Sequence, residues 1–369
     1  MRRTTAAPHE SRRAARWTWR LAAALAAALP LPLAAQQRGD VISGVVRSGG
    51  AAVPYAVVDL GAGMGRQFTD SSGTFRFAGV APGTHRVLAR QIGFRPFDST
   101  IVKVAGTPLS IAVDLEPLVV ELAAITVTTS RACTQPGPPD STASPQLAAL
   151  LEQIRVNAER YTLLADSYPF RYRMSRTFED YDAQGRVVES TTDTIGDVSR
   201  TRVRYRPGNV LATGLGPERT LAPIVRLPTL SDFADSAFQA NHCFFYAGIV
   251  DREAGQYVRF DIVPATTLRT PDIEGEVYLD AHSFQIRSAT IRLTRVARAM
   301  PGLLSASSTL TFAELYPNIL VLRRMEGELV PEARNDVKTP IVRSTEVRRL
   351  IDVHFERPLP GTGASPPPP

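Results

Sequence analysis

The sequence has few of the side chains from which catalytic and metal-binding sites are usually built. Its 369 residues include five histidines and two cysteines, and Lys103 and Lys338 are the only lysines. No histidine after residue 35 has a glutamate three residues later, and no serine lies in the G-x-S-x-G pattern of a nucleophile elbow. Neither lysine follows a glycine, as a P-loop lysine does. These absences argue against a zinc peptidase, a serine hydrolase and a P-loop nucleotidase. We therefore expect no enzymatic activity, no catalytic residues, no metal and no cofactor.

Long apolar runs are also missing, apart from one near the start of the chain. An Ala/Leu run at Leu21–Leu33 follows six arginines and precedes Ala34 and Ala35, which is the order of a secretory signal peptide. The run is too short to span a bilayer, which takes about 20 apolar residues. Residues 1–35 are therefore predicted to be a signal peptide, and the mature chain to have no transmembrane segment. Such an exported protein is expected to be periplasmic, outer-membrane-associated or extracellular.

The excess of basic charge belongs mainly to that first segment. Six of the 42 Lys and Arg residues and one of the 36 Asp and Glu residues lie in residues 1–35, which leaves 36 basic and 35 acidic residues. The sequence pI of 9.6 is thus largely a property of the part expected to be removed. Binding to phosphates needs a basic surface, so we expect no nucleic-acid partner.

Residues 40–129 have the pattern of a small β-domain. Short runs rich in β-branched and aromatic residues alternate with glycine-containing turns, and no helical period separates them. Ala56, Val58 and Leu60 alternate as in a half-buried strand. Asp70 followed by Gly73 fits a tight turn in which the aspartate accepts hydrogen bonds from the backbone. The pattern predicts a seven-stranded-type β-sandwich at the start of a mainly β protein.

The same segments carry a resemblance to a known family. The runs "ISGVV", "AVPYAVVDL", "TDSSGTFRFAGVAPGTHRVLARQIGF", "IAVDLEP" and "LAAITVT" follow one another as in the carboxypeptidase-regulatory-like domain. The resemblance covers the whole unit and implies a transthyretin-like sandwich, a fold similar to carbohydrate-binding domains. In that family the domain is the non-catalytic accessory part, so the resemblance implies no peptidase activity.

The composition of the remaining chain predicts a second domain with flexible segments on either side. A Pro/Ser-rich linker is expected at residues 130–144, because its low apolar content does not support a packed element. The second domain is expected at residues 145–356. The Pro-rich end, residues 357–369, is predicted to be a disordered tail.

The second domain is predicted to be an α+β unit. Apolar residues at helical spacing predict a helix from Pro145 to about Tyr161, with Ser144 as a possible N-cap. Strand patterns dominate from Phe170 onward and are interrupted by a helical segment at Ser231–Ala240. One early helix and a long antiparallel meander indicate a curved sheet packed on that helix.

Segments of this second part carry resemblances of their own. "LSDFADSAFQANHCFFYAG", "YVRFDIVP" and "DIEGEVYLDAHSFQIRSATI" are similar to the C-terminal region of secreted regulatory-like-domain proteins without a characterised function. The hairpin within the last run also resembles strands of lipoprotein-carrier half-barrels, and a carrier of that kind would require an apolar concave pocket in residues 170–356. The earlier run "LAAITVT" resembles the segment ahead of the plug in TonB-dependent outer-membrane receptors, although too few residues follow for a plug and a barrel.

Two motifs imitate a cofactor site and a metal site. The run "VVDLGAGMG" (57–65) resembles the cofactor loop of nucleoside-dependent methyltransferases. That chemistry needs a helix directly after the loop, whereas turn and strand residues follow here, so we predict a glycine hairpin turn. His242 beside Cys243 offers two metal ligands, but adjacent residues on a strand point to opposite faces. We therefore assign no metal.

An acidic group, Glu179, Asp180 and Asp182, precedes Gly185. Paired carboxylates can hydrolyse glycosides when they face each other across a cleft. On an exposed hairpin loop, acidic residues more often form and solvate the turn, and we predict that role here.

The two cysteines, Cys133 and Cys243, are expected to form a disulfide. An exported chain meets oxidising conditions, and two unpaired thiols are unfavourable there. Cys133 lies in the linker and Cys243 opens the strand "CFFYAGI". A bridge between them would attach the linker to the second domain and stabilise the fold by about 2–4 kcal/mol.

These observations favour a non-enzymatic, exported cell-envelope protein whose sandwich is an accessory or binding module. Similarity to carbohydrate-binding folds makes envelope glycan a candidate partner. Transport is the alternative class: a lipid or lipoprotein carrier, or a component associated with TonB-dependent outer-membrane receptors. An apolar cavity under the second sheet would favour carriage, and a flat polar sheet would favour scaffolding.

Overall fold

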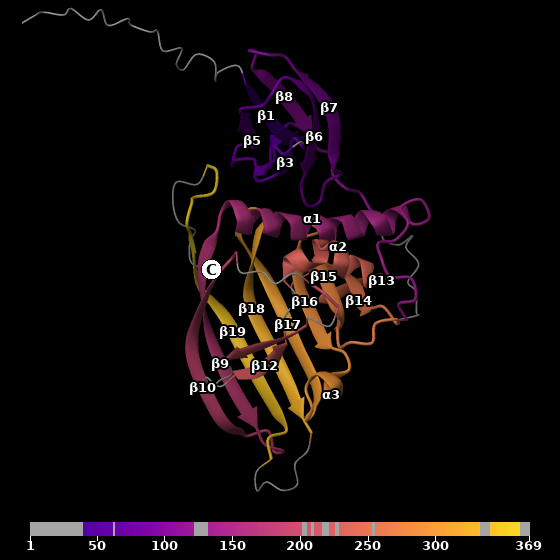
Figure 1. The fold of residues 1–369 in the computed structure, drawn as a ribbon, viewed down its shortest axis with the longest axis vertical. Helices are drawn as coiled ribbons and strands as arrows, with labels where there is room; N and C mark the ends of the chain where they lie inside the picture. Colours follow the sequence, from indigo (N-terminus) through magenta and orange to yellow (C-terminus); the bar gives the residue numbers. More distant parts are fainter. Residues whose placement is uncertain are drawn as a thin grey trace, which may run out of the picture.

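The structure of the protein is a computed structural model, and it describes most of the chain after residue 39. The described ranges are 40–61, 63–121, 132–200, 205–207, 210–215, 221–225, 229–252, 255–332 and 340–361, with the backbone alone described for 211–215 and 221–225. The predicted signal peptide, residues 1–35, lies outside the described residues. Figure 1 shows a small β-sandwich on one side of a long helix, α1, and a large curved sheet on the other.

Two four-stranded sheets with one common apolar core form the N-terminal sandwich. One sheet contains β1 (Val41–Ser48), β2 (Ala51–Ala52), β5 (Thr74–Ala78) and β8 (Leu109–Asp114), and the other contains β3 (Val57–Asp59), β4 (Arg66–Phe68), β6 (Gly83–Arg90) and β7 (Phe97–Lys103). Ile42, Val46, Val58 and Val87 are completely buried between them. The prediction of a mainly β protein that begins with a sandwich is confirmed. The short strands β2 and β4 were not predicted, because two or three residues are too few to show a periodic pattern.

The turn predicted at Asp70 is present. Asp70 Oδ1 accepts hydrogen bonds from the backbone N–H groups of Ser72 (2.9 Å) and Thr74 (2.8 Å). Gly73 has a φ of +77°, and a Cβ at this position would lie 2.6 Å from the carbonyl oxygen of Val46. Only glycine combines that backbone conformation with so close an approach of the neighbouring strand.

The second domain is built on one open antiparallel sheet of nine strands in the order β10-β9-β19-β18-β17-β16-β15-β14-β13. Their bounds are β9 (Phe170–Tyr181), β10 (Val187–Val198), β13 (His242–Arg252), β14 (Gly255–Pro264), β15 (Ile273–Asp280), β16 (Ile286–Leu293), β17 (Leu303–Tyr316), β18 (Ile319–Pro331) and β19 (Arg343–Phe355). β11 (Leu211–Leu215) and β12 (Leu221–Val225) form a separate hairpin. The meander is interrupted once, because the last strand, β19, lies between β18 and the first strand of the domain, β9.

Helix α1 (Pro145–Ser167) extends the predicted helix by about six residues at its C-terminal end. Leu163 and Leu164 continue its buried face beyond Tyr161 and pack in a cluster that also contains sandwich residues. Ser144 is the N-cap residue, as predicted, but its side chain makes no capping hydrogen bond; Pro145 begins the helix. Tertiary packing therefore sets the length of α1 more than its capping does.

Three short helical elements complete the second domain: η3 (Leu230–Ala234), α2 (Ser236–Ala240) and α3 (Val296–Ala299). The first two correspond to the helical segment predicted at Ser231–Ala240. Asp235 separates them and caps α2, since its Oδ1 accepts hydrogen bonds from Ala237 N (2.8 Å) and Phe238 N (3.3 Å). Together with α1, the pair η3 and α2 covers the main core of the sheet.

The sandwich is joined to the second domain by polar contacts along α1. Gln153 Oε1 accepts a hydrogen bond from Gly93 N (2.8 Å), and Arg90 forms an ion pair with Glu159 (2.6 Å). Apolar contact adds to these bonds, because one buried cluster contains residues of the sandwich, α1 and the large sheet. The two predicted domains thus pack through α1.

Arg160 lies at the centre of this junction and is only 3% exposed. Its guanidinium donates hydrogen bonds to the carbonyl oxygens of Tyr55, in the sandwich, and Asn318, in the β17–β18 turn. Its Cζ lies 5.3 Å from the ring centroid of Phe68. Burial lowers the pKa of Arg160 to about 9, and the charge of Glu314 opposes that shift. The sandwich and the sheet therefore share one buried cation.

The beginning of the predicted disordered tail is packed. Leu359 is 2% exposed and belongs to the cluster at this junction. A Cβ on Gly361 would lie 2.5 Å from Oγ of Ser71 in the sandwich. Residues 362–369 lie outside the described residues. Composition alone did not reveal that one leucine in a Pro-rich segment fills a gap between the two domains.

Candidate functional site

An apolar cavity of about 170 Å³ lies between α1, η3 and one face of the large sheet. Its walls come from β9, β17, β18 and β19, and the apolar residues lining it are Phe170, Leu230, Leu310, Phe312, Val321, Leu322, Met325, Leu350 and Val353. Close-packed cores contain few voids larger than a water molecule. A cavity of about 150 Å³ with a similar apolar lining stays dry and admits benzene in another protein. This space is therefore large enough for a small apolar group.

Polar groups line one part of the same cavity. Tyr161, Tyr172, Thr229 and Arg348 lie among the lining residues. Thr229 is exposed and the side chain of Arg348 is 32% exposed, so the cavity reaches the surface where these two residues lie. An apolar interior with a few polar groups on its wall is the usual composition of a small-molecule site.

Burial keeps the tyrosine hydroxyl of this wall neutral. It raises the pKa of Tyr172 to about 12, with smaller upward effects from Asp197 and Tyr161 and an opposing effect from Arg348. A neutral phenol can donate a hydrogen bond. The polar wall therefore offers a neutral donor and a cation.

The cavity depends on a pairing of strands that are distant in sequence. β19 pairs with β9 in the register Val353↔Tyr172, Leu350↔Met174 and Phe355↔Phe170. Cross-strand partners face the same side of a sheet, so this register places the two strands' apolar residues on one face. The sequence "DSYPFRYRMSRTFEDYD", which is rich in aromatic and polar residues, supplies the β9 part of this face.

The sequence suggested an apolar pocket in the second domain but indicated neither its location nor Arg348. The clue was the alternation along β9, where Phe170 and Tyr172 face the same side. In the structure Phe170 is buried, at 3% exposed, and Tyr172 is half-buried.

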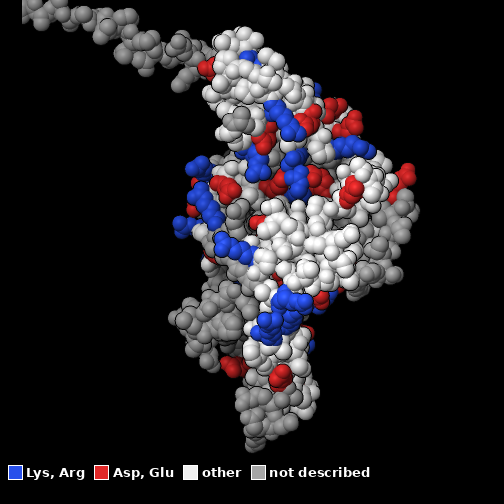
Figure 2. Space-filling model, turned by 45° about the vertical axis from the view of Figure 1, so that its right-hand side comes forward, with Lys and Arg blue, Asp and Glu red and all other residues white. Residues whose placement is uncertain are grey.

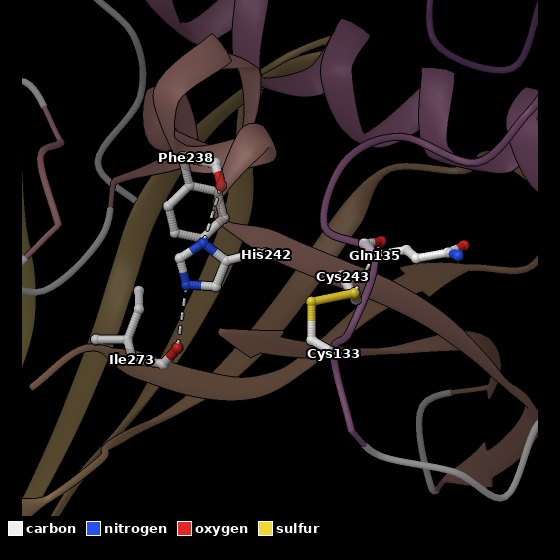
Figure 3. The surroundings of a disulfide bond; sticks show 6 residues. All are labelled: Cys133, Gln135, Phe238, His242, Cys243 and Ile273. Atoms are coloured by element: carbon white, nitrogen blue, oxygen red, sulfur yellow. Dashed lines mark hydrogen bonds between the residues drawn. A yellow bond between two sulfur atoms is a disulfide. The ribbon is translucent and has the colours of Figure 1, made fainter. Parts of the chain in front are cut away.

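The predicted disulfide is present and fixes the linker to the sheet. Cys133 and Cys243 are bonded, with their Cα atoms 5.4 Å apart, and both are buried (Figure 3). Thr266 N donates a hydrogen bond to the carbonyl oxygen of Cys133 (2.9 Å), and Gly137 N to that of His242 (3.0 Å). The described part of the linker, from residue 132, thus lies against the outer strand β13.

His242 serves the core rather than a metal. Its ring points away from the disulfide, and its two nitrogens lie 2.9 Å from the carbonyl oxygen of Phe238 and 3.2 Å from that of Ile273 (Figure 3). The ring also stacks on Phe238, with centroids 4.0 Å apart. Both nitrogens are therefore engaged. In the described part of the chain, no three His, Cys, Asp or Glu side chains are grouped so as to hold a metal ion.

The carboxylate Asp272 completes the surroundings of His242. It lies 3.5 Å from His242 Nε2 and accepts hydrogen bonds from the Tyr205 hydroxyl (2.6 Å) and Ile273 N (2.8 Å). Burial, with the hydrogen bond and charge of Asp272, raises the pKa of Tyr205. These contacts satisfy buried polar groups at the start of β13 and β15, which is a structural role.

Of the three acidic residues predicted to form an exposed turn between β9 and β10, only Asp182 does so, and it is buried. Asp182 Oδ1 accepts hydrogen bonds from Gln184 N and Arg186 N, both at 2.9 Å. Hydrogen bonds from the backbone N–H and the side chain of Arg186 hold the pKa of Asp182 below its usual value. Burial opposes this shift. Glu179 and Asp180 lie within β9 and pair in register with β10. The three carboxylates do not form a catalytic pair across a cleft.

The glycine loop that imitates a cofactor site is a hairpin between β3 and β4. Asp59 Oδ1 accepts a hydrogen bond from Gly61 N (2.6 Å), and Val57 pairs with Phe68. β4, not a helix, follows the loop; Ala62 lies outside the described residues. The loop therefore lacks the helix N-terminus on which a nucleotide would be bound.

On the face drawn in Figure 2, basic and acidic side chains are interspersed, and a broad area carries neither. This face offers no continuous basic surface of the kind that binds a nucleic-acid backbone. Among the described residues, the helices are too short or too polar to cross a membrane.

Comparison with known proteins identifies the first unit. Residues 41–116 match the family described as "Carboxypeptidase regulatory-like domain". The sandwich is a carboxypeptidase regulatory-like domain. The resemblance read from the sequence is thereby confirmed, and the regulatory-like domain accounts for β1 to β8. No curated protein matches the chain.

Several solved structures have a weak likeness to the chain. A LolA superfamily protein from Nitrosomonas europaea is 12% identical over 57% of this chain and 94% of that chain, with a TM-score of 0.29. A DUF1329 family protein from Desulfovibrio piger is 10% identical over 57% and 94%, with a TM-score of 0.31. A type II cohesin-X-dockerin complex from Acetivibrio cellulolyticus is 18% identical over 28% and 78%, with a TM-score of 0.20. TM-scores this low do not establish a common fold.

Proposed function

We propose that this chain is a non-enzymatic, exported envelope protein whose second domain binds the apolar chain of a lipid or a lipoprotein. The cavity between α1, η3 and the sheet carries this proposal. Of the two outcomes expected from the sequence, an apolar cavity favours carriage and a flat polar sheet favours scaffolding. The cavity supports carriage, the alternative that the hairpin resemblance implied.

The volume of the cavity limits what it can hold. At about 170 Å³ it is below the range of about 300–1,000 Å³ that is usual for drug-sized ligands. It therefore accommodates a short segment of one acyl chain, next to the polar wall that contains Arg348. Burial of each methylene contributes about 0.8 kcal/mol, so even a short buried segment supports measurable affinity.

The regulatory-like domain and the disulfide are proposed to hold α1 over the sheet. Arg160 and Gln153 join α1 to the sandwich, and Tyr161 of α1 lines the cavity. The sandwich thus acts as an accessory unit, because it supports α1, the helix that forms one wall of the cavity.

Glycan binding by the sandwich has less in its favour. Sugar-binding surfaces commonly present aromatic rings, and within residues 40–61 and 63–121 no aromatic side chain is exposed. Tyr55, Phe68, Phe75 and Phe77 are buried, and the other two, Phe94 and Phe97, are half-buried.

The experiment that tests the proposal measures binding of N-phenyl-1-naphthylamine, an uncharged dye that fluoresces in apolar surroundings. The purified, unreduced protein should bind the dye saturably, at one dye per chain, and dodecanol should displace it. A scaffold protein would show only weak, unsaturable enhancement of fluorescence. That result, with the protein shown to be folded by circular dichroism, would refute the carrier proposal.

A further inference from the structure

Two arginines from different strands lie side by side next to the cavity. Arg348 of β19 and Arg176 of β9 are direct partners in the antiparallel register. Cross-strand partners share one face of the sheet, and Arg348 lines the cavity, so Arg176 faces the same side. Like charges directly opposite each other destabilise a sheet, and here each arginine has a carboxylate partner, Asp193 for Arg176 and Glu346 for Arg348.

Arg176 has its hydrogen bonds largely satisfied within the protein. Its Nε donates to Asp193 Oδ1 on β10 (2.8 Å), and Nη2 of the same fork lies 2.5 Å from Asp193 Oδ2. Its Cζ lies 4.9 Å from the ring centroid of Phe178. The side chain is 16% exposed. Arg176 is thus held in an ion pair with Asp193 beside the cavity.

Arg348 is less fully engaged. Among the described residues it makes one hydrogen bond, from Nε to Glu346 Oε1 (2.6 Å). Its two terminal nitrogens therefore carry donors that no described residue accepts. A guanidinium with free terminal nitrogens is suited to bind a carboxylate or a phosphate through two parallel hydrogen bonds.

The neutral hydroxyl of Tyr172 lies on the same face, farther into the cavity. Tyr172 pairs with Val353, Met174 with Leu350, and Arg176 with Arg348, so the wall changes from apolar to charged over a few residues. Each arginine there has a carboxylate partner, Asp193 for Arg176 and Glu346 for Arg348. Along these strands, the site therefore has one end at Tyr172 and a second, charged end at the two arginines. An apolar chain is favoured at the Tyr172 end, and an anion is favoured at the arginine end.

We propose that the ligand is a single-chain amphiphile with an anionic headgroup, bound by the terminal nitrogens of Arg348 with Arg176 beside it. This inference rests on the proposed function, because it assumes that the cavity holds the apolar chain. The shared chemistry is an anionic oxygen group, either the carboxylate of a fatty acid or the phosphate of a lipid. Uncharged headgroups gain less from the terminal donors of Arg348, and a quaternary ammonium headgroup cannot accept a hydrogen bond from them.

The test compares four twelve-carbon ligands by displacement of the same uncharged dye, below their micelle concentrations and at pH 8. They are dodecanoate, dodecyl phosphate, dodecanol and dodecyltrimethylammonium. A charge-assisted hydrogen bond predicts that at least one anion binds about 10- to 100-fold more tightly than dodecanol. Whichever of dodecanoate and dodecyl phosphate binds more tightly identifies the source of the headgroup.

Variants at adjacent positions of β19 provide the matched control. Arg348→Gln should abolish the preference for anions and leave the affinity for dodecanol unchanged. Arg349→Gln changes the next residue, which points to the opposite face of the sheet, and should behave as the wild type. Arg348→Lys keeps the charge without the fork and should retain part of the preference.

The outcomes separate the two proposals. Equal affinities for anions and dodecanol, or an equal effect of Arg348→Gln and Arg349→Gln, would overturn the headgroup assignment and leave the cavity proposal in place. Failure of all four ligands to displace the dye, or absence of dye binding, would instead overturn the proposed function. If Arg348→Gln does not fold, the Arg348→Lys variant and the wild-type comparison decide the question.

Discussion

Filling the cavity should remove ligand binding without a loss of stability. Val353 of β19 is 8% exposed and lines the cavity, and Val353→Phe directs a ring into the empty space. Cavities cost about 24 cal/mol per Å³, so a cavity of about 170 Å³ represents at most about 4 kcal/mol of lost packing energy. A phenyl ring that fills about a quarter of it should recover about 1 kcal/mol.

The same substitution on the other face of β19 is the control. Val347 is adjacent to Arg348 and therefore points away from the cavity. Val347→Phe should leave dye binding unchanged. Val353→Phe should weaken dye binding at least tenfold, while its free energy of unfolding in urea stays equal to the wild type or rises by up to about 1 kcal/mol.

Two results would refute this reasoning. Wild-type binding by Val353→Phe would mean that the dye binds elsewhere. A loss of 1–3 kcal/mol in the free energy of unfolding is the usual cost of overpacking, and it would mean that the space at Val353 is already filled. Leu350→Trp, at another lining position, serves as an independent check on either result.

The remaining predictions concern stability. Cys243→Ser should lower the free energy of unfolding by about 2–4 kcal/mol, because it opens a loop spanning 110 positions; equal urea midpoints for reduced and unreduced wild-type protein would contradict this. Arg160→Leu leaves the carbonyl oxygens of Tyr55 and Asn318 without their donor and should cost about 2–4 kcal/mol in the same assay; a change below about 0.5 kcal/mol would argue against a shared buried cation. Asp182 has a pKa below its usual 3.8 in the folded state, so its contribution is complete above pH 3.8 and is lost as the pH falls through the folded value. Asp182→Asn should therefore be less stable than the wild type at pH 7, and the difference should shrink below pH 3.8; a constant difference would contradict the role given to its charge.

Much of the fold could be predicted from local patterns. The turn at Asp70 and the hairpin after Asp59 have residues whose conformations are specific to turns, and both are present. The disulfide was predictable because only one pairing of Cys133 and Cys243 exists. The helix at Pro145 was visible from its spacing, but its last turn depends on contacts with the sandwich.

The candidate site could not be predicted in the same way. The cavity wall joins β9 to β19, and the pair Arg176 and Arg348 is separated by more than 170 positions in the sequence. Each residue alone follows the ordinary alternation of a strand. They become neighbours because β19 lies between β9 and β18 in the sheet. Bulges in β18 and β19 also shift the register of the strand pairing. The periodicity of a single strand shows which of its side chains share a face, but not which strand distant in sequence becomes its partner.

Native mass spectrometry of the protein, isolated unreduced and without detergent from the cells that produce it, tests most directly whether the second domain carries an amphiphile. We expect a population heavier than the chain by the mass of one single-chain anionic amphiphile, which organic extraction releases and which Val353→Phe fails to retain. A chain that is ligand-free when isolated, and that acquires neither dodecanoate nor dodecanol when they are added, would contradict this expectation.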